Sequence, residues 1–178
     1  MPTAMIIIDM QQGSFIARTP RHDAEGLVGR INGLASRVRA SGGVIIHVQH
    51  DGPAGDVHHP SQPGWRLLPG LETAAVDLFV RKTACDAFLD TGLDEILRSA
   101  GIERVIITGC ATDFCVDTTV RSALARRYRT VVPIDGHTTA DRPYLAATKI
   151  IEHHNAVWAG FISPAGPALL MPCARIEI

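Results

Sequence analysis

An unbroken apolar run, residues 5–8, stands directly before the acidic residue Asp9. Such a run without alternating polar residues is typical of a β-strand that is buried on both faces. Further short β-branched runs follow along the chain, and they alternate with helix-length segments whose apolar residues recur every three or four positions. The alternation predicts a three-layer α/β/α fold, in which a mainly parallel sheet carries helices on both faces.

The expected strands and helices alternate along the chain. The expected strands are residues 5–8, 44–48, 77–80, 104–108 and 130–134, with a last edge strand within segments 157–162 and 169–178. The expected helices are residues 22–41, 91–100 and 113–127, and a fourth begins at Asp141 and Pro143. With no repeat and no low-complexity linker, residues 1–178 are expected to form one domain, for which this length is ordinary.

Charge and hydropathy exclude several classes of partner. Lys and Arg number 17 and Asp and Glu 18, so the formal charge of −1 gives no sign of the basic surface that binds nucleic acid. No apolar run reaches the roughly 18 residues of a membrane span. The amino terminus lacks the basic and apolar segments of a signal peptide, so we expect a cytoplasmic protein whose four cysteines are thiols.

The expected strand ends bring three reactive side chains to one edge of the sheet. In open α/β sheets chemistry lies beyond the carboxyl ends of the strands. Asp9 follows the first strand, Lys82 follows the third, and Cys115 lies at the start of the helix after the fourth. Lys82 stands out because the chain has fifteen arginines and only two lysines, and a lysine pKa shifts readily on burial.

Each of these residues also has an ordinary structural interpretation. Cys115, in the first turn of a helix, is expected to favour the thiolate, but a free cysteine is often a small buried apolar residue. Asp9 can serve as a general base or cap a loop, and Lys82 can extend from a strand end to water. Together they suggest a site for nucleophilic catalysis.

Three motifs resemble the isochorismatase-like cysteine hydrolases, a family that includes nicotinamidases and N-carbamoylsarcosine amidases. The motifs are Ile-Ile-Ile-Asp-Met-Gln at 6–11, Val-Arg-Lys at 80–82 and Gly-Cys-Ala-Thr-Asp-Phe-Cys-Val-Asp-Thr-Thr at 109–119. They occur in the family's order and spacing, and the similarity extends beyond Thr139-Ala140-Asp141, over most of the chain.

The resemblance implies a fold and a mechanism. It implies a six-stranded parallel sheet, a catalytic triad of Asp9, Lys82 and Cys115, and a cis peptide between Cys110 and Ala111. The Ala111 and Cys115 amides would then form an oxyanion hole for hydrolysis of a small-molecule amide or related C–N bond through a thioester. The family also implies a homo-dimer or homo-tetramer.

Two other reactions or roles stay open. Isochorismatase-type hydrolysis of a vinyl ether needs acid catalysis and no nucleophile, so the presence of Cys115 favours the amide. A non-catalytic flavodoxin-like binding module is the alternative from another class, and the absence of a Gly-rich phosphate loop counts against nucleotide binding. A redox pair of Cys110 and Cys115 does not match the C-x-x-C spacing.

The segment 49–71 is expected to shape the substrate pocket, since long loops in compact domains are usually functional. Gln49 stands where nicotinamidases carry a metal-binding aspartate, so we expect no metal and no cofactor, although His58 and His59 are potential ligands. The stretch resembles the metal-free branch of the family. The candidate substrate-binding residues are Phe15, His50, Trp65 and Thr112, with core packing as the favoured alternative for Trp65.

Overall fold

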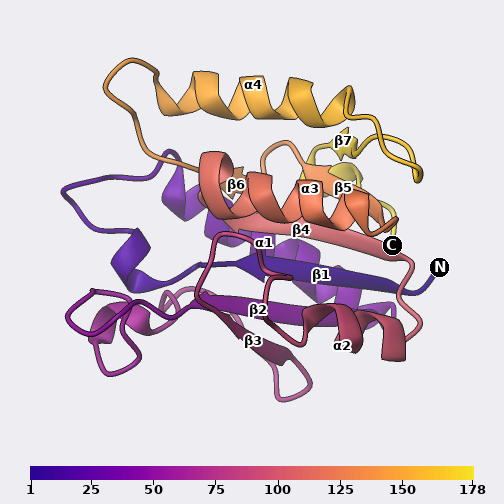
Figure 1. Ribbon diagram of the computed structural model, residues 1–178, viewed down its shortest axis with the longest axis horizontal. Coiled ribbons are helices and arrows are strands. Elements are labelled where there is room, and N and C mark those ends of the chain that lie inside the picture. Colours follow the sequence, from indigo (N-terminus) through magenta and orange to yellow (C-terminus); the bar gives the residue numbers. More distant parts are fainter.

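Parallel β-strands form the centre of the protein, described here from a computed structural model of residues 1–178. The strands are β1 (Thr3–Ile8), β2 (Val44–His50), β3 (Leu78–Lys82), β4 (Arg104–Cys110), β5 (Arg129–Pro133), β6 (His137–Thr138) and β7 (Leu169–Met171). Their order in the sheet is β3-β2-β1-β4-β5-β7, and every pairing is parallel (Figure 1). The predicted α/β fold is therefore confirmed.

One strand lies outside the six-stranded path that the family resemblance implies. The two residues of β6 pair with the end of β4, where Gly109 lies opposite His137, and so extend the sheet to seven strands. The central strand β1 is fully buried and pairs with both β2 and β4, so that Ile8 lies beside Val48 on one side and Gly109 on the other. Asp9 thus leaves the sheet at its centre.

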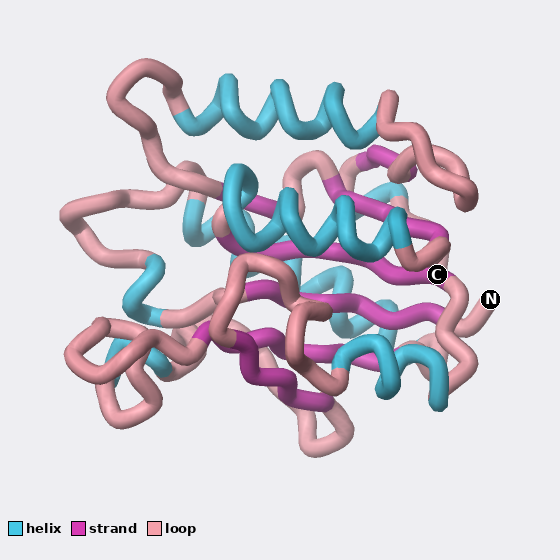
Figure 2. Tube along the Cα trace, viewed as in Figure 1, coloured by secondary structure: helices cyan, strands magenta, loops and turns pink.

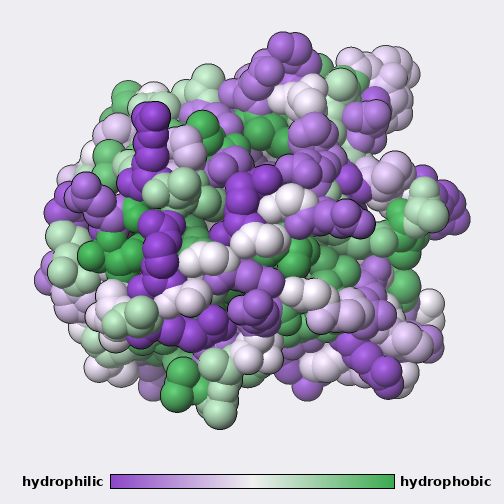
Figure 3. Space-filling model, turned by 180° about the vertical axis from the view of Figure 1, so that it is seen from behind, coloured by the Kyte–Doolittle hydropathy of each residue, from purple (hydrophilic) through white to green (hydrophobic).

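Helices cover both faces of the sheet, as the sequence pattern predicts. On one face lies α1 (Ala24–Ala40), whose apolar stripe packs on Met5 and Ile7. On the other face α2 (Leu93–Ser99), α3 (Asp117–Ala125) and α4 (Ala147–Ala159) contribute to the core cluster that contains Ile6 and Ile8. In Figure 2 the loops gather at the carboxyl end of the strands, where the site residues are expected. Seen from behind, polar residues interrupt the apolar surface (Figure 3).

Two predicted boundaries differ from the structure. The fourth helix begins at Ala147 rather than at Asp141, because Arg142 and Leu145 form an isolated bridge that holds the intervening residues in a loop. The Asp141 carboxylate instead accepts a hydrogen bond from the Ala147 amide at 2.8 Å. Residues 157–162 form no strand because α4 continues to Ala159, and the edge strand lies in the second apolar segment, at Leu169–Met171.

None of these helices is both long enough and apolar enough to cross a lipid bilayer.

The close approach of β4 to β1 predicts a strong effect of Gly109→Ala on stability. Gly109 has a φ of +118°, and a Cβ atom there would lie 2.1 Å from the Ile8 carbonyl oxygen. We expect the substitution to lower the free energy of unfolding by about 3 kcal/mol or more. Gly33→Ala is the matched control, because a Cβ in α1 meets nothing within 4 Å and should stabilise the helix by about 0.5–1 kcal/mol. Equal urea midpoints for the two variants would contradict this account.

Candidate active site

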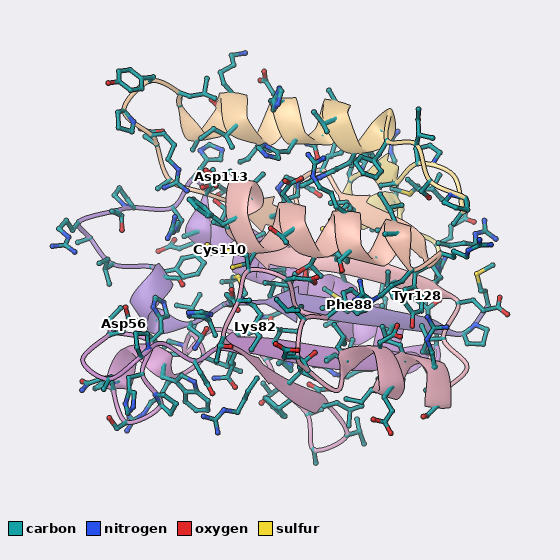
Figure 4. The ribbon with its side chains drawn as sticks, viewed as in Figure 1. Asp56, Lys82, Phe88, Cys110, Asp113 and Tyr128 are labelled. Atoms are coloured by element: carbon teal, nitrogen blue, oxygen red, sulfur yellow. The ribbon has the colours of Figure 1, made fainter.

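A buried lysine joins the three residues of the predicted triad. Lys82 Nζ donates hydrogen bonds to Asp9 Oδ2 at 2.7 Å, to the Ala84 carbonyl at 2.9 Å and to Cys115 Sγ at 3.3 Å. These three acceptors use all three protons of the ammonium group, whose side chain is 0% exposed. The structure therefore brings together residues that lie on β3, after β1 and in the turn before α3. Figure 4 shows Lys82 toward the carboxyl end of the sheet.

Cys115 does not have the lowered pKa that a position at a helix start favours. Burial, followed by the negative charge of Asp9, raises the pKa of Cys115 well above its usual value, although Lys82 opposes this effect. The start of the helix is also a π-helical turn, Thr112–Val116, rather than a regular first turn. For Lys82, burial alone would lower the pKa, but attraction to Asp9 and Cys115 outweighs it and raises the pKa. The Lys82 ammonium group thus contacts both the Asp9 carboxylate and the Cys115 sulfur.

A cavity of about 250 Å³ opens onto this group. Its walls are formed by Asp9, Ser14, Arg21, His50, His58, Cys85, Cys110, Ala111, Phe114, Cys115 and Arg142. Asp9, His50, Ala111 and Cys115 were expected there from the sequence. Burial, and then the charge of Lys82, lowers the pKa of His50, so this imidazole is neutral at neutral pH.

Three of the four candidate substrate-binding residues do not line this cavity. Thr112 is fully buried, and its hydroxyl is hydrogen-bonded to His137 Nδ1 at 2.9 Å. The Trp65 indole donates to Asp51 Oδ1 at 2.7 Å, a contact that holds the loop after β2. Phe15 packs against the core beside α1. Their sequence positions beside the site do not determine where their side chains point.

The end of β4 presents a free amide to the cavity. The Cys110–Ala111 peptide bond is cis, and the Ala111 N–H makes no hydrogen bond within the protein. Ala111 is 9% exposed and lies on the cavity wall. The neighbouring Cys110 is buried, which raises its pKa to about 12. An unpaired N–H at this position can donate a hydrogen bond to a negatively charged oxygen of a bound molecule.

The potential metal ligands are engaged elsewhere. Gln49 donates its side-chain amide to the Trp65 carbonyl at 3.0 Å, and His59 Nδ1 lies 2.7 Å from the Ser61 hydroxyl. No three His, Cys, Asp or Glu side chains lie together in an arrangement that could hold a metal ion.

His58 instead belongs to a chain of hydrogen bonds that the sequence interpretation missed. His58 Nδ1 lies 3.2 Å from Asp56 Oδ1, and His58 Nε2 lies 3.0 Å from the Ser14 hydroxyl. Because a carboxylate only accepts, the neutral ring carries its proton on Nδ1 and accepts the Ser14 proton at Nε2. The Ser14 oxygen can then accept a further hydrogen bond from a molecule in the cavity.

The arginines on the cavity wall were also missed. Arg142 directly follows the Thr139-Ala140-Asp141 stretch of the family resemblance, so its position carried a signal that was available in the sequence. Arg21 lies in an irregular segment between β1 and α1, where neither periodicity nor a motif indicates its role.

Comparison with known proteins identifies the family of this chain. Residues 3–159 match the family model of the isochorismatase domain. Streptothricin hydrolase from Streptomyces noursei is 36% identical over 140 residues, which cover 79% of this chain and 56% of that protein. This chain thus spans little more than half the length of that relative.

A second relative and a solved structure point the same way. Ureidoacrylate amidohydrolase RutB from Klebsiella pneumoniae is 28% identical over 166 residues, covering 73% of this chain and 70% of that protein. The crystal structure of an isochorismatase family protein superposes with a TM-score of 0.87 at 30% identity, over 95% of this chain and 97% of that one. The chain belongs to the isochorismatase family.

The charge of Asp9 predicts how the reactivity of Cys115 depends on pH. Asp9→Asn removes a negative charge that raises the Cys115 pKa, so the pKa should fall and thiolate should form at lower pH. We expect the pH profile for alkylation of Cys115 to shift to lower pH by about one unit or more. Such a shift corresponds to a change of about 1.4 kcal/mol in the interaction with the thiolate. Peptide mass spectrometry separates Cys115 from the exposed Cys85.

Asp90→Asn is the control, because Asp90 is an exposed residue that forms no ion pair. An unchanged or upward-shifted profile in Asp9→Asn would show that Asp9 does not act on the thiol.

Proposed function

We propose that this protein is a cysteine-dependent amidohydrolase that cleaves the C–N bond of a small amide through a thioester on Cys115. The observation that carries the proposal is the position of one buried ammonium, Lys82 Nζ, in contact with both the Asp9 carboxylate and the Cys115 sulfur. Asp9 and Cys115 both line the cavity, which supports roles as base and nucleophile.

Asp9 is suited to accept the thiol proton. Its Oδ2 is bonded to Lys82, whereas its Oδ1 is buried and has no hydrogen-bond partner. An unpartnered buried carboxylate oxygen is free to take a proton. Because burial and the charge of Asp9 disfavour a free thiolate, we assign proton transfer to Asp9 and attack of Cys115 Sγ on the carbonyl carbon to the same step. The positive charge of Lys82 compensates the negative charge that Asp9 and Cys115 share, so the buried site carries no net negative charge.

The remaining steps use the same groups. The carbonyl oxygen becomes an oxyanion, which the Ala111 and Cys115 amides would bind; one such donor contributes about 3–4 kcal/mol in comparable sites. Asp9 returns its proton to the leaving nitrogen as the C–N bond breaks, which leaves the acyl group on sulfur. Water then adds to the thioester and gives a proton to Asp9. As the C–S bond breaks, Asp9 passes this proton to the departing sulfur, which restores the Cys115 thiol and releases the carboxylic acid.

The alternative reaction uses less of this arrangement. Hydrolysis of a vinyl ether would employ Asp9 as an acid and leave Cys115 without a role. The name of the relative RutB, an amidohydrolase, also supports cleavage of an amide. Three further properties stay predictions from the sequence. They are the formation of one domain by residues 1–178, a cytoplasmic location, and assembly as a homo-dimer or homo-tetramer.

The proposal predicts that Cys115→Ala abolishes release of ammonia from a panel of small primary amides. We expect a loss of at least about a thousandfold in kcat, the scale seen when a covalent nucleophile is removed. Cys173→Ala is the matched control, because Cys173 lies in the core cluster beside α1, away from the cavity. Mass spectrometry of acid-quenched enzyme should detect acyl groups on Cys115. Turnover by Cys115→Ala at the wild-type rate would exclude the thioester mechanism.

A further inference from the structure

The two arginines on the cavity wall differ in their partners. Arg142 is paired with Asp113, with Nε 2.7 Å from Oδ2 and a terminal nitrogen 2.9 Å from Oδ1. Its guanidinium also lies 4.9 Å from the centre of the Phe114 ring. Arg21 makes a single hydrogen bond, from Nε to the Ser14 carbonyl at 2.6 Å. Its two terminal nitrogens have no partner, and no carboxylate lies within ion-pair distance.

The cavity therefore carries one unbalanced positive charge. Asp9 neutralises Lys82 and Asp113 neutralises Arg142, while Arg21 has no counterion. Arg21 is only partly exposed, so water screens its charge less than at an open surface. Its field reaches the end of β4: after burial, which raises the Cys110 pKa, the charge of Arg21 has the next largest influence and lowers it.

We propose that Arg21 binds an anionic group of the substrate, so that the amide cleaved at Cys115 carries a carboxylate. The inference rests on the proposed function and adds the chemical class of the substrate. A guanidinium offers parallel N–H donors that match a carboxylate in two hydrogen bonds. The bond from Nε to Ser14 fixes the group at the wall and leaves the terminal nitrogens available. A neighbour, Arg18, is exposed and lies outside the cavity wall.

Three primary amides of similar size test the charge preference. Succinamate carries a carboxylate, 4-oxopentanamide replaces it by a neutral acetyl group, and 4-aminobutanamide carries an ammonium. We expect kcat/KM for succinamate to exceed that for the neutral amide by ten- to a hundredfold, mainly through KM, and the cationic amide to be poorest. Arg21→Gln should reduce this ratio to near one, whereas Arg18→Gln should leave it unchanged.

A binding measurement tests the same subsite without turnover. Succinate, a product of succinamate, should protect Cys115 of the wild-type protein from alkylation by iodoacetamide, and added salt should weaken the protection. Arg21→Gln should raise the succinate concentration needed by at least about tenfold, the effect of losing one charge-assisted pair. Succinate should protect Cys115 of the Arg18→Gln variant at the same concentration as in the wild type.

The outcomes separate the two proposals. Equal hydrolysis of the charged and neutral amides, dependent on Cys115, would overturn the anionic subsite and leave the amidohydrolase in place. Protection by succinate that requires Arg21, without hydrolysis of any of the amides, would support the subsite and count against the proposed reaction. Full succinate protection in Arg21→Gln would overturn the subsite whatever the turnover.

Discussion

The buried ion pair between Lys82 and Asp9 is the interaction on which the candidate site depends. Both side chains are withdrawn from water, at 0% and 7% exposure, so each charge is stable there only because the other is present. Removing one partner of such a pair typically costs about 3–5 kcal/mol. Lys82 also donates to the Cys115 sulfur, so the same ammonium group fixes the Asp9 carboxylate and this sulfur relative to each other. The same ion pair therefore determines both the positions of these side chains and the balance of charge in the site.

The parallel sheet is what makes this pair possible. Because parallel strands end at the same edge, residues 73 positions apart in the chain meet within hydrogen-bond distance. The turn after β1 helps, since Asp9 itself adopts a φ of +48° while its amide donates to the Val48 carbonyl. On the other side Gly109 lets β4 approach β1 more closely than a side chain would allow. The backbone around Asp9 is thus held from both neighbouring strands.

The sequence could predict the residues at strand ends but not those on loops. Apolar runs and helical periodicity determine the order and direction of the elements, and these place Asp9, Lys82 and Cys115 together. Loop side chains follow from hydrogen bonds between distant segments, such as Trp65 to Asp51, which no periodicity encodes. Thr112 and Cys115 are three positions apart, yet a π-helical turn directs one to His137 and the other to the cavity. The raised pKa of Cys115 was missed because burial depends on the complete fold.

Two of the three cysteines on the cavity wall, Cys110 and Cys115, differ in their contacts. Cys110 and Cys115 both line the cavity, and burial raises the pKa of each. The direction of the pKa shift is therefore the same for both thiols and does not distinguish the candidate nucleophile from the other. Cys115 differs in contacting Lys82, which is bonded in turn to a carboxylate with an unpartnered oxygen, so its proton has an acceptor at hand. Cys110 has no such partner, because its backbone forms the end of β4 and its thiol packs in the core cluster beside α1. Access to a positioned base, rather than intrinsic acidity, makes Cys115 the candidate nucleophile.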